Sequence, residues 1–190
     1  MNIWLDIDNP KYIPFYKALI DALKEKKHTV TITAQNSKDI KKTLKQYGIN
    51  AKIIGIIFSV FGLFLEQVIL LRTALLSNYI GNRPIDIAFS LGSEPILFTC
   101  VNDKLPIVSF LENAEEKVHP LSYILEKSFF IFPDSVPEQM LVDKKFDLDK
   151  IARCKEKIKK EDLTPDIKSI NEIINKIEFF ANHISGKLKG

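Results

Sequence analysis

The sequence predicts an α/β fold: a doubly wound, mainly parallel, Rossmann-like sheet with helices on both faces. Short apolar segments alternate with longer amphipathic segments along most of the chain, as they do in chains of β-α-β units. Several of the short segments are apolar throughout, which is typical of strands buried on both faces. The length of 190 residues and the hydrophobic content of 46% suit one soluble globular domain with a substantial core.

The first half of the chain is expected to hold three strand–helix pairs. The predicted elements are a strand at 2–7, a helix from 10 to about 26, a strand at 28–33, a helix at 37–47, a strand at 51–55 and a helix at 60–79. The first strand is an apolar run that ends in acidic residues, and the second is rich in β-branched residues. The second helix is terminated by Tyr-Gly-Ile, and the third ends near Gly81.

The second half repeats the alternation with different turn residues. Its predicted elements are a strand at 85–91, a helix from 94 to about 102, a strand at 105–112, a helix at 119–127, a sixth buried strand at 128–132 and a helix or turn at 133–142. Crossovers between parallel strands of one sheet are right-handed, so this order of elements fixes the winding of the fold.

We expect the α/β domain to span residues 1–147, followed by a charged, lysine-rich connector at 148–166 and an amphipathic helix at 167–190. Apolar residues recur in that last helix at steps of three and four, which makes one continuous stripe. Such a stripe has to be covered, either by the domain itself or by a partner chain.

Composition narrows the classes of function. The net charge is only +3, and 24 of the 27 basic residues are lysine, whereas arginine is the side chain suited to phosphates and base edges. We therefore expect no nucleic-acid partner. Cys100 and Cys154 form no CxxC pair, and His28, His119 and His183 are scattered, so neither a metal site nor a tightly bound cofactor is expected. A strand begins at once without a signal peptide, which favours the cytoplasm.

Polar residues follow three of the predicted strands, and the carboxyl ends of parallel strands meet at one rim where ligands bind. The rim residues are Asp6, Asp8, Asn9 and Pro10 after the first strand, Gly92, Ser93 and Glu94 after the fourth, and Glu112 after the fifth. The first helix begins just after Pro10, so its dipole favours an anion at the rim.

The pair Asp6 and Asp8 has two other interpretations. In haloacid-dehalogenase-type phosphatases an aspartate nucleophile and an acid/base aspartate stand at this spacing, but here Pro10 occupies a position that those enzymes fill with Thr or Val. Alternatively, Asp8 is an N-cap or Asx turn before the first helix, with Asn9 assisting, and Asp6 only ends the strand.

The opening, MNIWLDIDNPKYIPFYKALIDALKEKKHTVTITAQ, resembles that of an archaeal and bacterial family of unassigned function, domain of unknown function 354. The resemblance continues through YGINAKIIG, PIDIAFSLGSEP, LPIVSFLEN, FPDSVPEQML and KIARCKEKIKKEDLTPD, to about residue 166. In the opening, the positions that match are Trp4, Asp6, Asn9, Pro10, Phe15, Leu19, Ile20, His28, Thr33 and Ala34.

The family looks like glycosyltransferases of the two-Rossmann-domain (GT-B) type, and the resemblance implies the N-terminal, acceptor-side half of such an enzyme. The nucleotide-sugar donor is then bound only through a second domain, supplied by a partner. In such a domain we expect acceptor contacts from the rim residues Asp6, Asn9, Pro10, Gly92, Ser93 and Glu94. The candidate catalytic base is Asp8 or Glu112, because deprotonating an acceptor hydroxyl needs a carboxylate within reach, although the family leaves the Asp8 position variable. In the first loop, Tyr12 stands where the family has a histidine, and Pro14 is a second departure from the family's pattern. Because such departures remove side chains that the family has there, we expect the chain to be catalytically incomplete alone, or a degenerate binding module.

The stretch 53–71 is the most apolar part of the chain. Its 13 uncharged residues from 53 to 65 fall short of the roughly 20 that span a bilayer. One interpretation is a buried strand and a core helix. The other is a surface that touches a membrane, a lipid-linked acceptor or a partner, through Phe58, Val60, Phe61, Leu63 and Phe64.

A function of another class also fits this pattern. The last helix and the apolar stretch would both serve association in a noncatalytic interaction protein that forms a homodimer.

Overall fold

The computed structural model describes residues 1–56, 65–112, 127–155 and 167–187. Within them, seven parallel strands form one sheet in the order β3-β2-β1-β4-β5-β6-β7. The strands are β1 (Asn2–Ile7), β2 (Thr29–Gln35), β3 (Lys52–Ile54), β4 (Ile87–Ser90), β5 (Ile107–Phe110), β6 (Ser128–Pro133) and β7 (Ile151–Cys154). The doubly wound α/β fold predicted from the sequence is confirmed.

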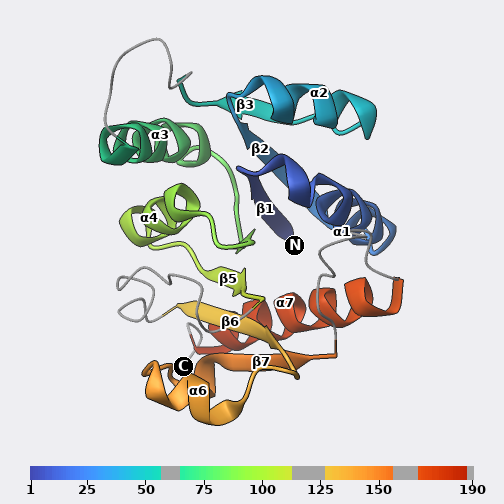
Figure 1. Cartoon of the computed structure of the whole chain (residues 1–190), viewed down its shortest axis with the longest axis vertical. Coiled ribbons are helices and arrows are strands. Elements are labelled where there is room, and N and C mark those ends of the chain that lie inside the picture. Colours follow the sequence, from blue (N-terminus) through green and yellow to red (C-terminus); the bar gives the residue numbers. More distant parts are fainter. Residues whose placement is uncertain (57–64, 113–126, 156–166, 188–190) are drawn as a thin grey trace.

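Helices cover both faces of this sheet, as Figure 1 shows. On one face lie α1 (Ile13–Glu25), α2 (Lys38–Gln46) and α7 (Ile167–Lys187). On the other face lie α3 (Leu65–Ile80), α4 (Glu94–Asp103) and the short α6 (Glu138–Asp143). Two 3-10 turns, η1 (Pro10–Tyr12) and η3 (Leu148–Lys150), precede α1 and β7.

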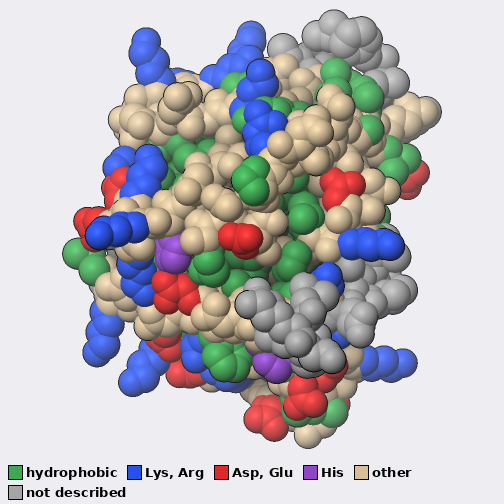
Figure 2. Space-filling model, turned by 180° about the vertical axis from the view of Figure 1, so that it is seen from behind, with side chains coloured by type: hydrophobic (Ala, Val, Ile, Leu, Met, Phe, Trp, Pro, Cys, Tyr) green, Lys and Arg blue, Asp and Glu red, His purple; other side chains and the backbone are tan. Residues whose placement is uncertain are grey.

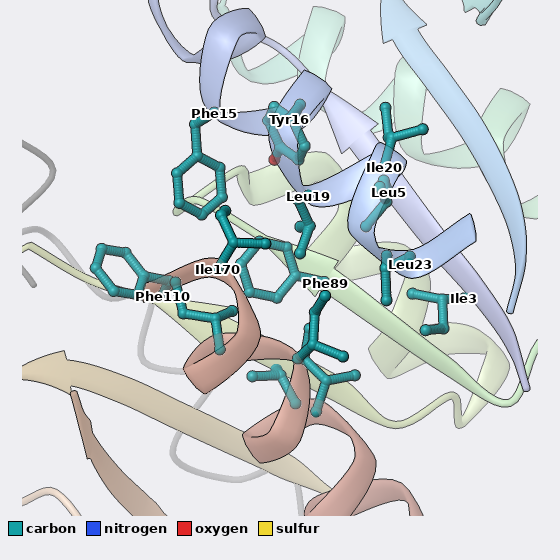
Figure 3. Packing of buried hydrophobic residues seen from close by; sticks show 14 of the residues in the cluster. Ile3, Leu5, Phe15, Tyr16, Leu19, Ile20, Leu23, Phe89, Phe110 and Ile170 are labelled. Atoms are coloured by element: carbon teal, nitrogen blue, oxygen red, sulfur yellow. The ribbon is translucent and has the colours of Figure 1, made fainter. Parts of the chain in front are cut away.

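The core under α1 and α7 is built from large side chains that are fully buried. Phe15 of α1 stacks on Phe89 of β4 with ring centroids 6.3 Å apart, and its ring lies 6.2 Å from that of Phe110 in β5. Figure 3 shows these rings meeting Ile170 of α7 in the middle of the layer. Burying each such side chain contributes about 1.5–3 kcal/mol, so this layer holds α1 and α7 on the sheet.

Helix α7 is covered by the domain itself. Most of the predicted stripe is buried against α1 and the sheet, and Phe180 stacks on Phe129 of β6 at 4.2 Å. At the edge of this contact Glu178 accepts hydrogen bonds from Lys26 at 3.3 Å and pairs with His28 at 2.8 Å. These partners hold the pKa of Glu178 below its ordinary value, although burial alone would raise it.

The structure differs from the sequence prediction inside the expected connector. Residues 151–154, predicted to be part of that charged segment, form the edge strand β7. The strand is only four residues long and is followed by a lysine-rich run, and both its length and its charged flank are usual for edge strands. Residues 156–166 and most of the predicted helix at 119–127 lie outside the described residues. Helix α6 begins at Glu138, later than the predicted 133, because Pro133 still belongs to β6, and the predicted start of α3 at 60 lies outside the described residues. The other helices and strands begin and end within a few residues of their predicted bounds.

On one face of the molecule, charge is distributed rather than concentrated. Figure 2 shows Lys and Arg side chains spread around one face of the molecule with acidic side chains between them. On that face the basic residues solvate the protein without forming one continuous stripe.

If α7 is an integral part of the domain, truncating a buried residue of its stripe will destabilise the whole chain. We expect Ile177→Ala to lower the free energy of unfolding by about 2–5 kcal/mol, because Ile177 is fully buried. The matched control is Phe179→Ala on the outer face, where the side chain is 63% exposed and the loss is expected to be about 1 kcal/mol or less. Denaturant unfolding measures both variants, and equal losses would contradict the packing described.

Candidate functional site

The site lies where the winding of the sheet reverses. Strand β1 pairs with β2 on one side and with β4 on the other, so the connections after β1 and β4 run to opposite faces. A crevice opens at such a switch point, beyond the carboxyl ends of the strands. Here it is a pocket of about 320 Å³ lined by Asp8, Gln35, Val68, Ile69, Arg72, Gly92, Glu94 and Pro95.

The wall of the pocket rests on a buried ion pair. Arg72 of α3 donates from Nη2 to Asp6 Oδ1 at 2.7 Å, and its Nε donates to the Ile54 carbonyl at 3.2 Å. Asp6 is fully buried and Arg72 is 3% exposed. Nη1 of Arg72 is also buried, and it has no hydrogen-bond partner among the described residues.

Hydrogen bonds from three further elements fix Asp6. The Thr33 hydroxyl of β2 donates to Asp6 Oδ1 at 2.6 Å and accepts from the Trp4 indole at 2.9 Å. The Tyr16 hydroxyl donates to the Asp6 carbonyl at 2.9 Å, and Ser93 Oγ lies 3.4 Å from Asp6 Oδ2. A carboxylate enclosed in this way cannot attack a phosphoester, which argues against the phosphatase interpretation.

Asp8 lies in a different environment, two residues further along. The cap before α1 belongs to Asn9, whose side chain accepts from the Lys11 amide at 3.0 Å, so no capping bond ties up the Asp8 carboxyl. Burial and the neighbouring charge of Asp6 raise the pKa of Asp8 from 3.8 to about 6, against the lowering effects of the Ser93 hydroxyl and Arg72. A half-buried carboxyl with a raised pKa at a pocket is typical of functional sites.

The loop between β4 and α4 forms the opposite wall. Gly92 has φ +83°, a conformation that side-chain-bearing residues rarely adopt. The Ser93 amide donates to Ser90 Oγ at 2.8 Å, which turns the chain into α4 and leaves Glu94 and Pro95 lining the pocket.

Burial and the charges of Asp8 and Asp6 raise the pKa of Tyr16 well above its ordinary value, so its hydroxyl keeps its proton.

The structure brings only part of the predicted rim together. Asp8, Gly92 and Glu94 line the pocket, with Asp6 and Ser93 directly behind. Pro10 lies in η1, and Glu112, half-buried just beyond β5, is outside the lining. The apolar contact residues Phe58, Val60, Phe61, Leu63 and Phe64 are outside the described residues.

The sequence prediction missed the apolar lining residues Val68, Ile69 and Pro95 and two polar ones, Arg72 and Gln35. Gln35 ends β2 on the same rim. Arg72 is one of only three arginines in the chain and lies in an apolar helix, and this unusual placement of a charged residue was a usable signal of a special role.

Within the described ranges no three His, Cys, Asp or Glu residues cluster as metal ligands, and no helix there has the length and apolar character to cross a membrane.

A sequence model of one family, described as "Protein of unknown function (DUF354)", matches residues 1–184. The chain belongs to the DUF354 family. No curated protein sequence matches it.

Solved structures with the same fold include sugar-nucleotide proteins. UDP-GlcNAc 2-epimerase from Neisseria meningitidis, bound to UDP-GlcNAc, is similar with a TM-score of 0.66 and 13% identity, over 81% of this chain and 46% of that one. The MnaA–UDP structure from S. aureus has a TM-score of 0.64 and 14% identity, over 80% and 44%. MurG from Acinetobacter baumannii has a TM-score of 0.60 and 14% identity, over 81% and 45%.

At these identities the likeness shows the fold alone. The DUF354 chain has the Rossmann-like fold of N-terminal domains in GT-B glycosyltransferases and epimerases. It spans less than half the length of the three structures compared.

The buried pair makes a sharp stability prediction. Asp6→Asn leaves the Arg72 charge without its counter-ion in the interior, and we expect a loss of about 3–5 kcal/mol in the free energy of unfolding. Asp21→Asn is the control, because Asp21 pairs with Lys17 on the surface of α1, where a loss below about 1 kcal/mol is expected. Losses of similar size in denaturant unfolding would contradict the role given to Asp6.

The raised pKa of Asp8 makes a pH prediction. Between its unfolded value of 3.8 and its folded value of about 6, the folded chain holds a proton that the unfolded chain has lost, so the contribution of Asp8 to stability falls as pH rises through this window. Asp8→Asn removes the titration. We expect the variant to gain stability relative to the wild type as pH rises from about 4 to about 7, measured by denaturant unfolding. A difference that stays constant with pH would contradict the assignment.

Proposed function

We propose that this chain is the acceptor-side domain of a GT-B-type glycosyltransferase-like enzyme and works with a second domain that binds a nucleotide-sugar donor. The observation that carries the proposal is the pocket at the β1/β4 switch point, with Asp8 and Glu94 in its walls. Ligands of open α/β sheets bind at this place. The similar epimerase structure holds UDP-GlcNAc and is more than twice as long as the matched part, which supports a donor site on a second domain.

In this proposal Asp8 is the general base. With a pKa of about 6 its carboxylate is largely ionised near pH 7, and it is basic enough to accept a proton from an acceptor hydroxyl. The hydroxyl oxygen bonds to the anomeric carbon of the donor sugar as its proton moves to Asp8, and the nucleotide leaves with the electron pair of the broken bond. Glu112 is the weaker candidate, because it lies beyond β5, two strands from β1, and outside the pocket lining.

Asp6 acts as a positioning residue. It is not among the lining residues, but it binds the guanidinium of Arg72, a residue that does line the pocket. The predicted acceptor contacts of Gly92 and Glu94 remain part of the proposal. Ser93 does not line the pocket, and in this proposal its hydroxyl acts indirectly, through its contact with Asp6.

The test uses the tagged chain isolated from its native cells together with its associated chains. Transfer from a panel of radiolabelled UDP-sugars is assayed before and after a high-salt wash that strips partners. We expect transfer only before the wash, and Asp8→Asn to lower its rate by about 100-fold or more. Asp21→Asn, which changes an exposed carboxylate on α1, is expected to leave the rate unchanged.

Two results would contradict the proposal. Full transfer by the stripped 190-residue chain would remove the need for a second domain, and full transfer by Asp8→Asn would remove the base. Absence of transfer from every preparation would favour a degenerate binding module.

We also propose that the domain works in the cytoplasm at a membrane surface, where a lipid-linked acceptor would be presented. The supporting observation is an exposed apolar face on α3, where Leu70, Leu71 and Leu75 are 63%, 40% and 39% exposed. Neighbouring exposed leucines of this kind favour an apolar contact.

Vesicle binding tests this location. We expect the chain to co-sediment with anionic phospholipid vesicles and Leu71→Glu to weaken that binding about tenfold, since a charge replaces a side chain placed in the interface. The matched control is Leu148→Glu, because Leu148 is similarly exposed, at 44%, but belongs to η3 beside β7. Equal binding by both variants would contradict a contact through α3.

A further inference from the structure

The charges around the pocket disfavour an anionic ligand. Asp8 and Glu94 bring two carboxyl groups to its walls, and Arg72 is the basic residue among the described lining residues. The charge of Arg72 is already balanced by Asp6 at 2.7 Å. An anion in the pocket would therefore meet two carboxyl groups and an arginine whose charge is already paired, so the electrostatic interaction with these walls disfavours it.

The start of α4 is also a poor phosphate cradle. A helix N-terminus binds phosphate through its first free amides, but the Ser93 amide already donates to Ser90 Oγ and Pro95 has no N–H. The carboxylate of Glu94 occupies the first turn, where it meets the helix dipole itself. With the Ser93 amide already bonded, no N–H on Pro95 and a carboxylate in the first turn, this wall of the pocket is less suited to a phosphate than an ordinary helix N-terminus.

What the pocket does offer is a mixture of hydrogen-bond donors and acceptors on its polar side chains. Nη1 of Arg72 is buried and has no partner among the described residues, so the donor that the pocket surface offers is the side-chain amide of Gln35. The carboxylates of Asp8 and Glu94 accept from O–H groups, and the amide of Gln35 both donates and accepts. A sugar hydroxyl also donates and accepts hydrogen bonds, so it matches this mixture of groups.

The remaining lining is apolar and the volume is small. Val68, Ile69 and Pro95 supply a surface for the C–H face of a ring. At about 320 Å³ the pocket lies at the lower end of ligand sites, which run from about 300 to 1,000 Å³. That volume suits one ring better than a nucleotide.

We infer that this pocket binds a single neutral sugar ring, with hydroxyls donating to the carboxylates of Asp8 and Glu94 and accepting from the side-chain amide of Gln35. The inference rests on the proposed function, whose acceptor it identifies as an uncharged sugar unit rather than a phosphorylated or nucleotide group.

The test is an NMR titration of the isotope-labelled chain with probes of each class: D-glucose, D-mannose and N-acetyl-D-glucosamine as neutral sugars, and inorganic phosphate and UDP as anions. We expect at least one sugar to shift the amide signals of Gln35, Arg72, Gly92 and Glu94 in a saturable way, and neither anion to shift them at the same concentration. Glu94→Ala is expected to weaken the sugar binding about tenfold, since it removes a charged acceptor.

Glu138→Ala is the matched control, because Glu138 occupies the first turn of α6 as Glu94 does in α4 but is outside the pocket. It should leave sugar binding unchanged, and the amide spectrum of each variant shows that the fold is kept. Saturable shifts at the pocket with phosphate or UDP, or none with any sugar, would overturn the inference. Sugar binding at the pocket without transfer in any preparation would leave this inference standing and defeat the proposed function instead.

Discussion

The buried ion pair between Asp6 and Arg72 is the interaction on which the rest of the site depends. Two charges removed from water are stable only if they are paired and hydrogen-bonded, and here both are, except that Nη1 of Arg72 has no partner among the described residues. Arg72 reaches Asp6 with Nη2 and the Ile54 carbonyl with Nε, and Asp6 in turn is bound by Thr33. One guanidinium thus joins β1, β3 and α3 at the switch point. A lysine ammonium, with its single nitrogen, would not hold both contacts in this geometry.

The pair also explains why two aspartates one residue apart have different properties. Asp6 points into the face covered by α3 and α4, where its charge is compensated by Arg72. Asp8 lies past the end of the strand, beside that buried charge, with its pKa raised to about 6. Asn9 takes over the capping of the next turn, so the Asp8 carboxyl is left for the pocket. Environment rather than residue type gives the two aspartates their different properties.

Much of the fold could be predicted from the sequence, because short apolar runs such as 129–132 in β6 are typical of strands buried on both faces of a parallel sheet. The edge strand β7 was missed since only four residues carry it and a lysine-rich run follows them. Loops after β1 and β4 could be assigned to one rim, because parallel strands end on the same side. Arg72 could not be placed there, since its position depends on how α3 docks, and helix docking is a tertiary property that no local pattern encodes. The burial of Asp6 was missed for the same reason, because α3 is what encloses it.

These observations support a single account, in which an ion pair fixed by the fold shapes a small, acidic pocket and leaves one carboxyl beside it able to exchange a proton near neutral pH. The donor of a transfer reaction would come from a second domain, and the acceptor would enter this pocket. The measurement that tests this most directly is a ¹³C NMR titration of the Asp8 side-chain carboxyl in the wild-type chain. The account predicts a midpoint at about 6, as burial and Asp6 require. A midpoint at the ordinary value of 3.8 would contradict it.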